Sequence, residues 1–302
     1  MARVRRWTEV RVEAPKEAQE AVANFLMERG SNGVVIEEGK GQEGFEVIKA
    51  YFPPALMIQA PSISLYLEAI REFFPEIRRS AVRVRSIADR DWMERWRSFF
   101  KPSQPSRGIV VKPPWISLAP RDVIVIDIEP GMAFGTGTHP TTRLCLRALE
   151  RAFAGEYGLL PGDEHRPYSV LDVGMGSGIL MIGAAKLGAR SVLGIDVDQR
   201  AVENARKNVR INGLRGRIRM RKATISEIEG RFDLVVANID AKTIEEMRSR
   251  LMDRVAAGGI LVLSGFSEGE AGPLSKDFRD GSFTLAEVSQ EDGWACIVLR
   301  RA

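Results

Sequence analysis

The sequence predicts an α/β protein with a mostly parallel, Rossmann-like sheet that ends in an antiparallel hairpin, preceded by a smaller α+β domain. Three observations support this prediction. The chain has 302 residues, enough for two domains. Strand and helix patterns alternate between residues 169 and 264, as in βαβ units. The first ninety residues follow another order, β-α-β-β-α-β, which is the ferredoxin-like arrangement.

Residues 1–88 are expected to form the smaller domain. Its strands are predicted at 7–13, 33–37, 45–52 and 81–87, and its helices at 15–29 and 61–74. The domain has no cluster of His, Cys or carboxylate residues that suggests catalysis. Recognition of a substrate or packing therefore suits it better than an active site.

Residues 89–106 are expected to be an interdomain helix and linker. Trp92 and Trp96 lie four residues apart, on one helical face, and prolines follow at 102 and 105. The two tryptophans suit packing between domains better than contact with a substrate.

Residues 107–302 are expected to form the larger domain. Its strands are predicted at 109–111, 123–128, 169–173, 191–195, 217–221, 232–237 and 259–264, and its helices at 141–153, 178–187, 199–211 and 241–256. The alternation between residues 169 and 264 predicts a parallel sheet with helices on both faces. Two further strands, at 283–289 and 295–300, flank a turn at 291–293 and predict the closing hairpin.

Composition indicates a globular chain of modest charge. Hydrophobic residues make up 44% of the sequence, and no apolar run approaches the roughly 18 residues of a membrane helix. No apolar signal segment follows the basic residues 1–11, so we expect a cytoplasmic protein. Cys145 and Cys296 are the only cysteines, and we expect them to be buried thiols. We expect no metal site.

The strongest motif follows the predicted strand at 169–173, where three glycines occupy alternate positions: Gly174, Gly176 and Gly178. Glycines at a strand end let a ligand approach the backbone, and open α/β sheets bind ligands at the carboxyl ends of their strands. A dinucleotide fingerprint needs a glycine where Ile179 stands. The spacing therefore favours S-adenosylmethionine and disfavours an NAD-dependent oxidoreductase. A merely structural turn is the alternative.

Polar residues end three of the predicted strands. Asp196, 24 residues after Asp172, is placed to accept hydrogen bonds from ribose hydroxyls. Asp172 is expected either to fix the glycine turn or to reach the amino group of the cofactor's methionine moiety. Asp198 suits a helix cap. Asn238 can accept a hydrogen bond from a substrate amine and aim its lone pair at the transferred methyl group, or else it turns the chain or caps the next helix.

Residues 131–142 contain three glycines and four threonines. Ordering such a glycine-rich segment costs much backbone entropy. The composition therefore indicates that a particular backbone shape is needed here. Amides and hydroxyls at the start of the following helix suit the carboxylate of the cofactor. His139 in this segment suits a structural role better than that of a general base.

Arginines alternate at 215, 217, 219 and 221, so on a strand they would share one face. A solvated face and a patch that contacts RNA or a ribosomal partner both fit this pattern. The net charge of the chain, +4, is compatible with both a solvated face and a binding patch.

These motifs resemble those of the ribosomal protein L11 methyltransferases, the PrmA family. GMAFGTGTHPTT at 131–142, LDVGMGSGIL at 171–180, GIDVD at 194–198 and VVANI at 235–239 occur in the order and spacing of that family. DWMERWRSFFKP at 91–102 is similar to its interdomain segment, and the N-terminal pattern is similar to its substrate-recognition domain.

The resemblance implies a class I methyltransferase fold and methyl transfer from S-adenosylmethionine to a large-subunit ribosomal protein, free or on the ribosome. The acceptors implied are lysine side chains and the N-terminal amine. Cofactor contacts are implied at Thr142, Gly174, Asp196 and Asn238. We expect Asp172, Gly176 and Gly178 to line the same site, and Asn238 to be catalytic. Since a desolvated amine beside a sulfonium loses its proton readily, we expect no dedicated general base.

The chain departs from the family pattern at Met175, at Asp240 and in the long loop at 155–168. Because Asp240 lies beside the presumed amine site, a PrmA-like enzyme acting on another protein or a small amine is one alternative. A cofactor-binding protein that associates with RNA or the ribosome and has little catalytic activity is another. The intact 131–142 segment and Asn238 argue against the second.

Overall fold

The structure is a computed structural model that describes the following residues: 6–37, 41–54, 56, 58–88, 100–118, 120–129, 137–158, 168–278 and 281–302. The chain divides into two compact units, Met1–Phe100 and Lys101–Ala302. Most of the predicted interdomain helix, residues 89–99, lies outside the described residues. Ser103–Ser106, which the sequence assigns to the linker, forms strand β5 of the second unit. None of the described helices is long and apolar enough to cross a membrane.

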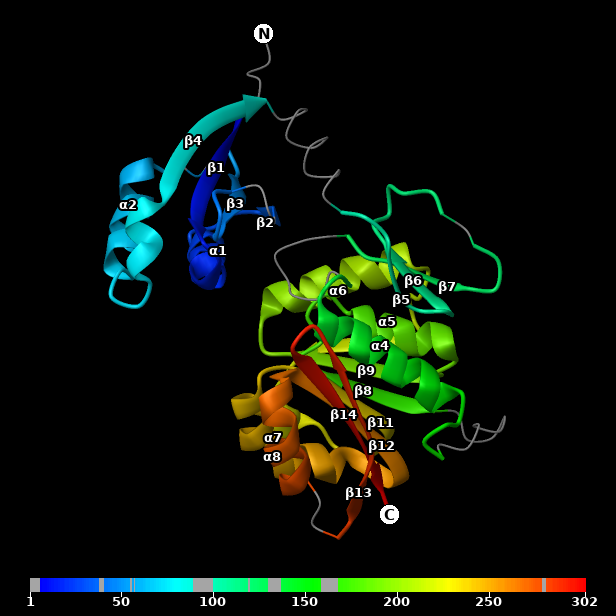
Figure 1. The fold of residues 1–302 in the computed structure, drawn as a ribbon. Coiled ribbons are helices and arrows are strands. Elements are labelled where there is room, and N and C mark those ends of the chain that lie inside the picture. Colours follow the sequence, from blue (N-terminus) through cyan, green and yellow to red (C-terminus); the bar gives the residue numbers. More distant parts are fainter. Residues whose placement is uncertain are drawn as a thin grey trace. The chain divides into compact units, whose positions relative to one another are not determined.

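The first unit is a four-stranded antiparallel sheet with its helices on one face. Its elements are β1 (Arg6–Pro15), η1 (Lys16–Ala18), α1 (Gln19–Glu28), β2 (Val34–Glu37), β3 (Phe45–Phe52), α2 (Ala60–Ala69), η2 (Pro75–Arg79) and β4 (Ala81–Ala88). The strand order β2-β3-β1-β4 is ferredoxin-like, as predicted (Figure 1). The second helix ends at Ala69, five residues before the predicted end, and a 3-10 turn that begins at Pro75 follows it.

The two faces of this first sheet differ. Alternate strand residues, among them Val10 and Ile48, form the core with α1 and α2. On the other face, Trp7 and Tyr51 belong to a small apolar cluster. Glu9 lies on that face as well, almost fully buried, and its Oε1 accepts a hydrogen bond from Arg85 Nε at 2.5 Å. The second face therefore combines aromatic and charged side chains.

The second unit is built around a seven-stranded sheet. Its elements are β5 (Ser103–Ser106), β6 (Ile109–Lys112), β7 (Ile124–Asp127), α4 (Pro140–Phe153), β8 (Ser169–Val173), α5 (Ile179–Leu187), β9 (Ser191–Asp196), α6 (Gln199–Ile211), β10 (Ile218–Lys222), η3 (Ile225–Glu227), β11 (Phe232–Asn238), α7 (Ala241–Arg254), β12 (Val255–Ser267), α8 (Glu268–Asp277), β13 (Phe283–Glu291) and β14 (Trp294–Arg301). The strand order is β10-β9-β8-β11-β12-β14-β13. The first five strands are parallel and β14 is antiparallel to both of its neighbours, so the predicted parallel sheet and closing hairpin are confirmed.

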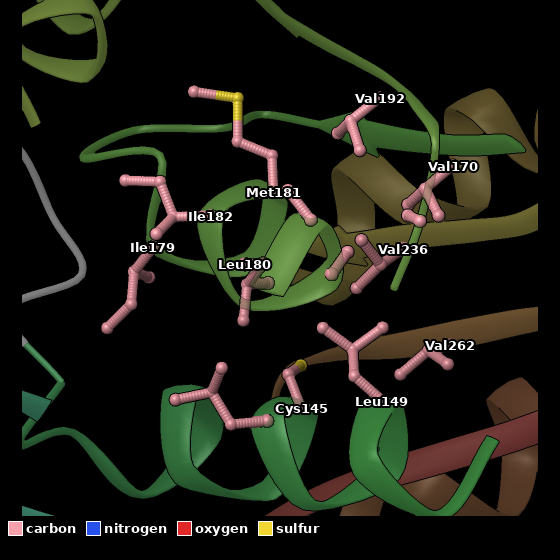
Figure 2. Packing of buried hydrophobic residues seen from close by; sticks show 14 of the residues in the cluster. Cys145, Leu149, Val170, Ile179, Leu180, Met181, Ile182, Val192, Val236 and Val262 are labelled. Carbon is pink, nitrogen blue, oxygen red and sulfur yellow. The ribbon is translucent and has the colours of Figure 1, made fainter. Parts of the chain in front are cut away.

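Helices cover both faces of this sheet, α4, α5 and α6 on one and α7 and α8 on the other (Figure 1). Successive strand residues point to opposite faces, so Val170 packs toward α5 and Leu171 toward α7. Figure 2 shows Cys145 and Leu149 of α4 directed toward Leu180 of α5 and Val262 of β12. The cysteines are free, buried thiols, as expected.

Helix α8 is the longest described element that the sequence pattern did not predict. Its ten residues include Gly269, Gly272 and Pro273, which all disfavour a helix interior. A capping box at its start compensates for these residues. The side chain of Ser267 accepts the backbone N–H of Glu270, and the N–H and hydroxyl of Ser267 donate to the Glu270 carboxylate. Ala271 and Leu274 are buried against the sheet. Tertiary packing therefore overrides a poor local propensity.

Candidate functional site

The glycine turn lies at the carboxyl end of β8, next to the carboxyl ends of β9 and β11. The N–H of Gly174 donates to the carbonyl of Ile195 at 2.9 Å, which ties the turn to β9. Gly174 has φ +73°, and a Cβ there would lie 2.6 Å from Ile239 Cγ2. Gly178 has φ +80°, and a Cβ there would meet Met181 and Ala205. Both positions therefore need glycine for conformation and for space.

Asp172 lies under this turn and is almost fully buried. Its Oδ2 accepts the N–H of Met181 at 3.1 Å, in the first turn of α5. Its Oδ1 is buried without a hydrogen-bond partner. Desolvation by burial and the nearby charge of Asp196 raise the pKa of Asp172 to about 7, although the hydrogen bond from Met181 opposes them. One carboxylate oxygen thus fixes the turn, and the other is available to a ligand.

Asp196 ends β9 and joins two segments of the site. Its Oδ2 accepts the N–H of Gly176 at 3.0 Å, and its Oδ1 accepts the N–H of Asp198 at 2.9 Å. A carboxylate has about four lone-pair positions, so each oxygen keeps the capacity for another donor such as a hydroxyl. Asp198 caps α6 by accepting the N–H of Arg200, as expected.

Asn238 is the last residue of β11, and its neighbour Ala237 pairs with Val173 at the end of β8. Its Oδ1 is buried without a hydrogen-bond partner. The cap of α7 is Asp240, which accepts the N–H and the hydroxyl of Thr243 at 2.9 and 2.6 Å. Those two bonds lower the pKa of Asp240. The structure therefore assigns capping to Asp240 and leaves Oδ1 of Asn238 without a partner among the described residues.

The described part of the Gly/Thr-rich segment, residues 137–142, opens α4, whereas residues 131–136 lie outside the described residues. His139 is the N-cap: its Nδ1 accepts the N–H of Thr141 at 3.3 Å, and its ring meets Trp294 edge to face. Burial, with a smaller effect of Arg143, lowers the pKa of His139. Thr142 is fully buried, and its hydroxyl oxygen has no hydrogen-bond partner.

Three of the buried oxygen atoms that lack a partner therefore belong to residues that the sequence placed in the site: Thr142, Asp172 and Asn238. Buried polar atoms are nearly always hydrogen-bonded in folded proteins, so three orphans in motifs at the ends of neighbouring elements are consistent with groups that a ligand would engage. The three atoms supply one hydroxyl, one carboxylate and one carboxamide, which suit the ammonium and other donors of an amino-acid moiety. The residues present therefore fit S-adenosylmethionine.

One residue that holds the site together was missed by the sequence analysis. Asn208 of α6 is fully buried; its Nδ2 donates to the carbonyl of Ser177, and its Oδ1 accepts the N–H of Glu129, both at 2.9 Å. It thereby links the glycine turn to the residue that precedes segment 130–136. Asn212, one turn later, binds both backbone groups of Asp127. The available signal was a pair of asparagines four residues apart on the buried side of a helix.

The strand order and the glycine turn, with acids at the ends of β8 and β9, define a methyltransferase of the S-adenosylmethionine-dependent α/β class. A family model described as ribosomal protein L11 methyltransferase (PrmA) matches residues 6–302. The chain belongs to this family. It is therefore an enzyme that uses S-adenosylmethionine as its methyl donor.

Individual relatives agree over nearly the whole chain. The ribosomal protein L11 methyltransferase of Geobacter sulfurreducens is 39% identical over 98% of both chains. That of Bacillus cytotoxicus is 34% identical over 98% of this chain and 100% of its own. A crystal structure of the ribosomal protein L11 methylase of Lactobacillus delbrueckii subsp. bulgaricus superposes with a TM-score of 0.58 at 30% identity and covers 66% of this chain and 98% of its own.

Proposed function

We propose that this methyltransferase modifies amino groups of ribosomal protein L11, at lysine side chains, at the N-terminal amine or at both. The names of the relatives supply the substrate, and the match extends through both units of the chain. The observation that carries the site assignment is the set of orphan oxygens on Thr142, Asp172 and Asn238. All three stand in motifs that the sequence alone singles out.

We propose the following roles in binding the cofactor. Asp196 accepts hydrogen bonds from the ribose hydroxyls, because its position at the end of β9 and its spare lone pairs suit them. The free Oδ1 of Asp172 and the hydroxyl of Thr142 bind polar groups of the methionine moiety. Gly174, Gly176 and Gly178 form the tight turn, each with a positive φ, that brings the backbone close to the ligand.

When bound, S-adenosylmethionine supplies a methyl group activated by its sulfonium. Asn238 accepts a hydrogen bond from the incoming amine and so orients its lone pair, and such positioning accounts for several kcal/mol of a barrier. The amine must be neutral, and the lowered dielectric of a closed site favours its neutral form. His139 is committed to capping α4, so we propose that no dedicated general base acts.

We propose that the first unit recognises the protein substrate. The similarity of its β-α-β-β-α-β order to the substrate-recognition domain of the family supports this proposal. We also propose that the enzyme acts in the cytoplasm, which suits a ribosomal protein substrate. We further propose contact with RNA, which the exposed arginines at one edge of the larger sheet support.

The test combines substrate mapping with matched variants. Labelled S-adenosylmethionine is incubated with the protein and either free L11 or large ribosomal subunits, and methylated residues are mapped by mass spectrometry. Label on L11 amines supports the proposal. Label on another protein or a small amine indicates the first alternative substrate class, and no label at all indicates a binding protein with little catalytic activity.

Two variants separate binding from catalysis. Asp196→Ala is expected to weaken cofactor binding by at least tenfold in calorimetry, whereas Asp198→Ala, two residues away, removes only a helix cap. Asn238→Ala is expected to lower kcat with little change in cofactor affinity. Equal cofactor affinities of Asp196→Ala and the wild type would refute the ribose assignment. A loss of several orders of magnitude in kcat on His139→Ala would refute the absence of a general base.

A further inference from the structure

The outer edge of the larger sheet carries more positive charge than the whole chain does. Residues 199–231, which run from α6 through β10 to the start of β11, contain ten arginine or lysine residues and three glutamates. This segment therefore has a net charge of +7, compared with +4 for the complete chain. The remainder of the chain is slightly acidic, so the positive charge is concentrated in one segment.

The structure divides the alternating arginines of this segment into two groups, which corrects the expectation that all four share one strand face. β10 begins only at Ile218, so Arg219 and Arg221 alone alternate on the strand. Arg217 instead donates to the carbonyls of Ala185 and Ala189 at the end of α5, at 3.3 and 3.4 Å. It serves the fold, whereas the other side chains extend into solvent.

Six exposed cations lie on the edge strand β10, on the connection before it, and on α6, which packs on the face of β10 opposite to Arg219 and Arg221. We call them the basic edge: Arg206, Arg210, Arg215, Arg219, Arg221 and Lys222. Within the part of the chain that the structure describes, no side-chain hydrogen bond or ion pair engages any of the six. Arg221 acts only at longer range, where it contributes to the lowered pKa of Glu227.

Among the described elements, no α-helix covers β10 on the side that Arg219 and Arg221 face. The connection from β10 to β11 contains only the 3-10 turn η3. A cavity of about 740 Å³ opens there between Leu193, the two arginines and Phe232. Glu227 and Glu229 also line it, and Glu227 is bound to Thr224. These acids make the cavity itself a poor site for anions, so an anionic ligand is expected along the strand edge.

We propose that the basic edge binds the phosphate backbone of RNA. Arginine presents a planar fork of donors that matches phosphate oxygens, and five of the six residues are arginines. Same-face residues on a strand lie roughly 6.6 Å apart, a spacing that successive phosphates of an extended strand can match. RNA is chosen over an acidic protein because the proposed substrate is a ribosomal protein, whose neighbours are RNA; in that respect the inference rests on the proposed function.

The test measures RNA binding without cofactor or protein substrate, so its outcome is independent of methyl transfer. A fluorescently labelled single-stranded RNA of about twenty nucleotides is titrated with the full chain at several salt concentrations, and anisotropy is recorded. Arg219→Gln/Arg221→Gln is compared with Arg121→Gln/Lys276→Gln, which removes the same charge from exposed positions elsewhere. Cofactor affinity is measured for each variant, and unchanged values show that the folds are intact.

The wild type is expected to bind, with affinity that falls steeply as salt rises. The Arg219/Arg221 variant is expected to bind roughly tenfold more weakly and to show a salt slope lower by about 2, one for each lost phosphate contact. The matched control is expected to stay within about twofold of the wild type. The proposal is overturned if both variants weaken binding equally, if neither does, or if poly-glutamate displaces the RNA at equal charge concentration.

Discussion

Two regions of the second unit are rich in arginine, and their arginines have opposite surroundings. Three arginines on α4, at 143, 147 and 151, are each bound to carboxylates: Glu156, Glu287, Glu291 and Asp292. Except for Glu156, these acids lie on or beside the β13–β14 hairpin. The basic edge has no such partners within the described residues. The arginines of α4 therefore stabilise the fold, whereas those of β10 are available to a ligand.

The difference shows that pairing, and not the number of charges, separates structural from functional cations. An exposed charge without a partner has little influence on stability. When one partner of a half-buried ion pair is removed, the other remains as a poorly solvated ion, and this lowers the free energy of unfolding. Substitutions in the two regions should therefore have effects of very different size on stability, and a buried charge without any counter-ion should have the largest effect.

Asp172 is that limiting case, because no ion pair within the described residues holds it. Its pKa is raised from 3.8 to about 7, so the native state holds a proton that the unfolded state releases, and stability falls as pH rises through this window. The shift of the Asp172 pKa corresponds to a loss of at most roughly 4 kcal/mol in the free energy of unfolding. Asp172→Asn should remove this pH-dependent loss, as measured by urea unfolding at pH 4 to 8.

Parallel stability curves for Asp172→Asn and the wild type across that range would contradict this account. Glu291→Gln is a useful control, because its carboxylate is paired with Arg143 and its replacement should destabilise the protein at neutral pH instead.

Arg143→Ala should have the next largest effect. Arg143 Nε donates to Glu291 at 2.5 Å, its Nη2 to Asp292 at 2.9 Å, and a further N–H to the carbonyl of Thr138. The Arg143 and Glu291 side chains are each about three-quarters buried. We expect a loss of about 2 kcal/mol in the free energy of unfolding, between the values for exposed and buried pairs. Urea unfolding measures it, and Arg143→Lys should recover part of the loss. A loss below about 0.5 kcal/mol would mean that the pairing is incidental.

Local chemistry made much of the site predictable. The glycine turn, Asp196 and the cap at Asp198 follow from residue types at fixed spacings, and the structure places them where those spacings predict. The different roles of Arg217 and Arg219 were not predictable. They depend on the carbonyls at the end of α5 that Arg217 binds, and no local sequence pattern reveals that contact. The bridging role of Asn208 is likewise visible only in three dimensions.

Asp240→Ala tests whether an acid beside the site serves the fold or the reaction. As the N-cap of α7, Asp240 binds Thr243, and loss of such a cap costs about 1 kcal/mol. Asp240→Asn, which can also cap, should lose only a fraction of this. Both variants should keep the methyl-transfer rate of the wild type at saturating substrate. A kcat at least tenfold lower with normal stability would instead place Asp240 in substrate binding.

The smallest effects are expected at the sheet edge, where two neighbouring arginines provide an internal comparison. Arg217→Gln should cost roughly 1 kcal/mol, because the two carbonyls at the end of α5 lose their charged donor. Arg219→Gln should change stability by less than about 0.5 kcal/mol, since its side chain is exposed and makes no hydrogen bond or ion pair within the described residues. RNA binding should show the reverse order, with the larger loss at Arg219. Thermal unfolding and anisotropy on the same preparations would establish both orders. If the two variants have equal effects in both measurements, then hydrogen bonding within the fold does not distinguish structural from ligand-binding arginines at this edge.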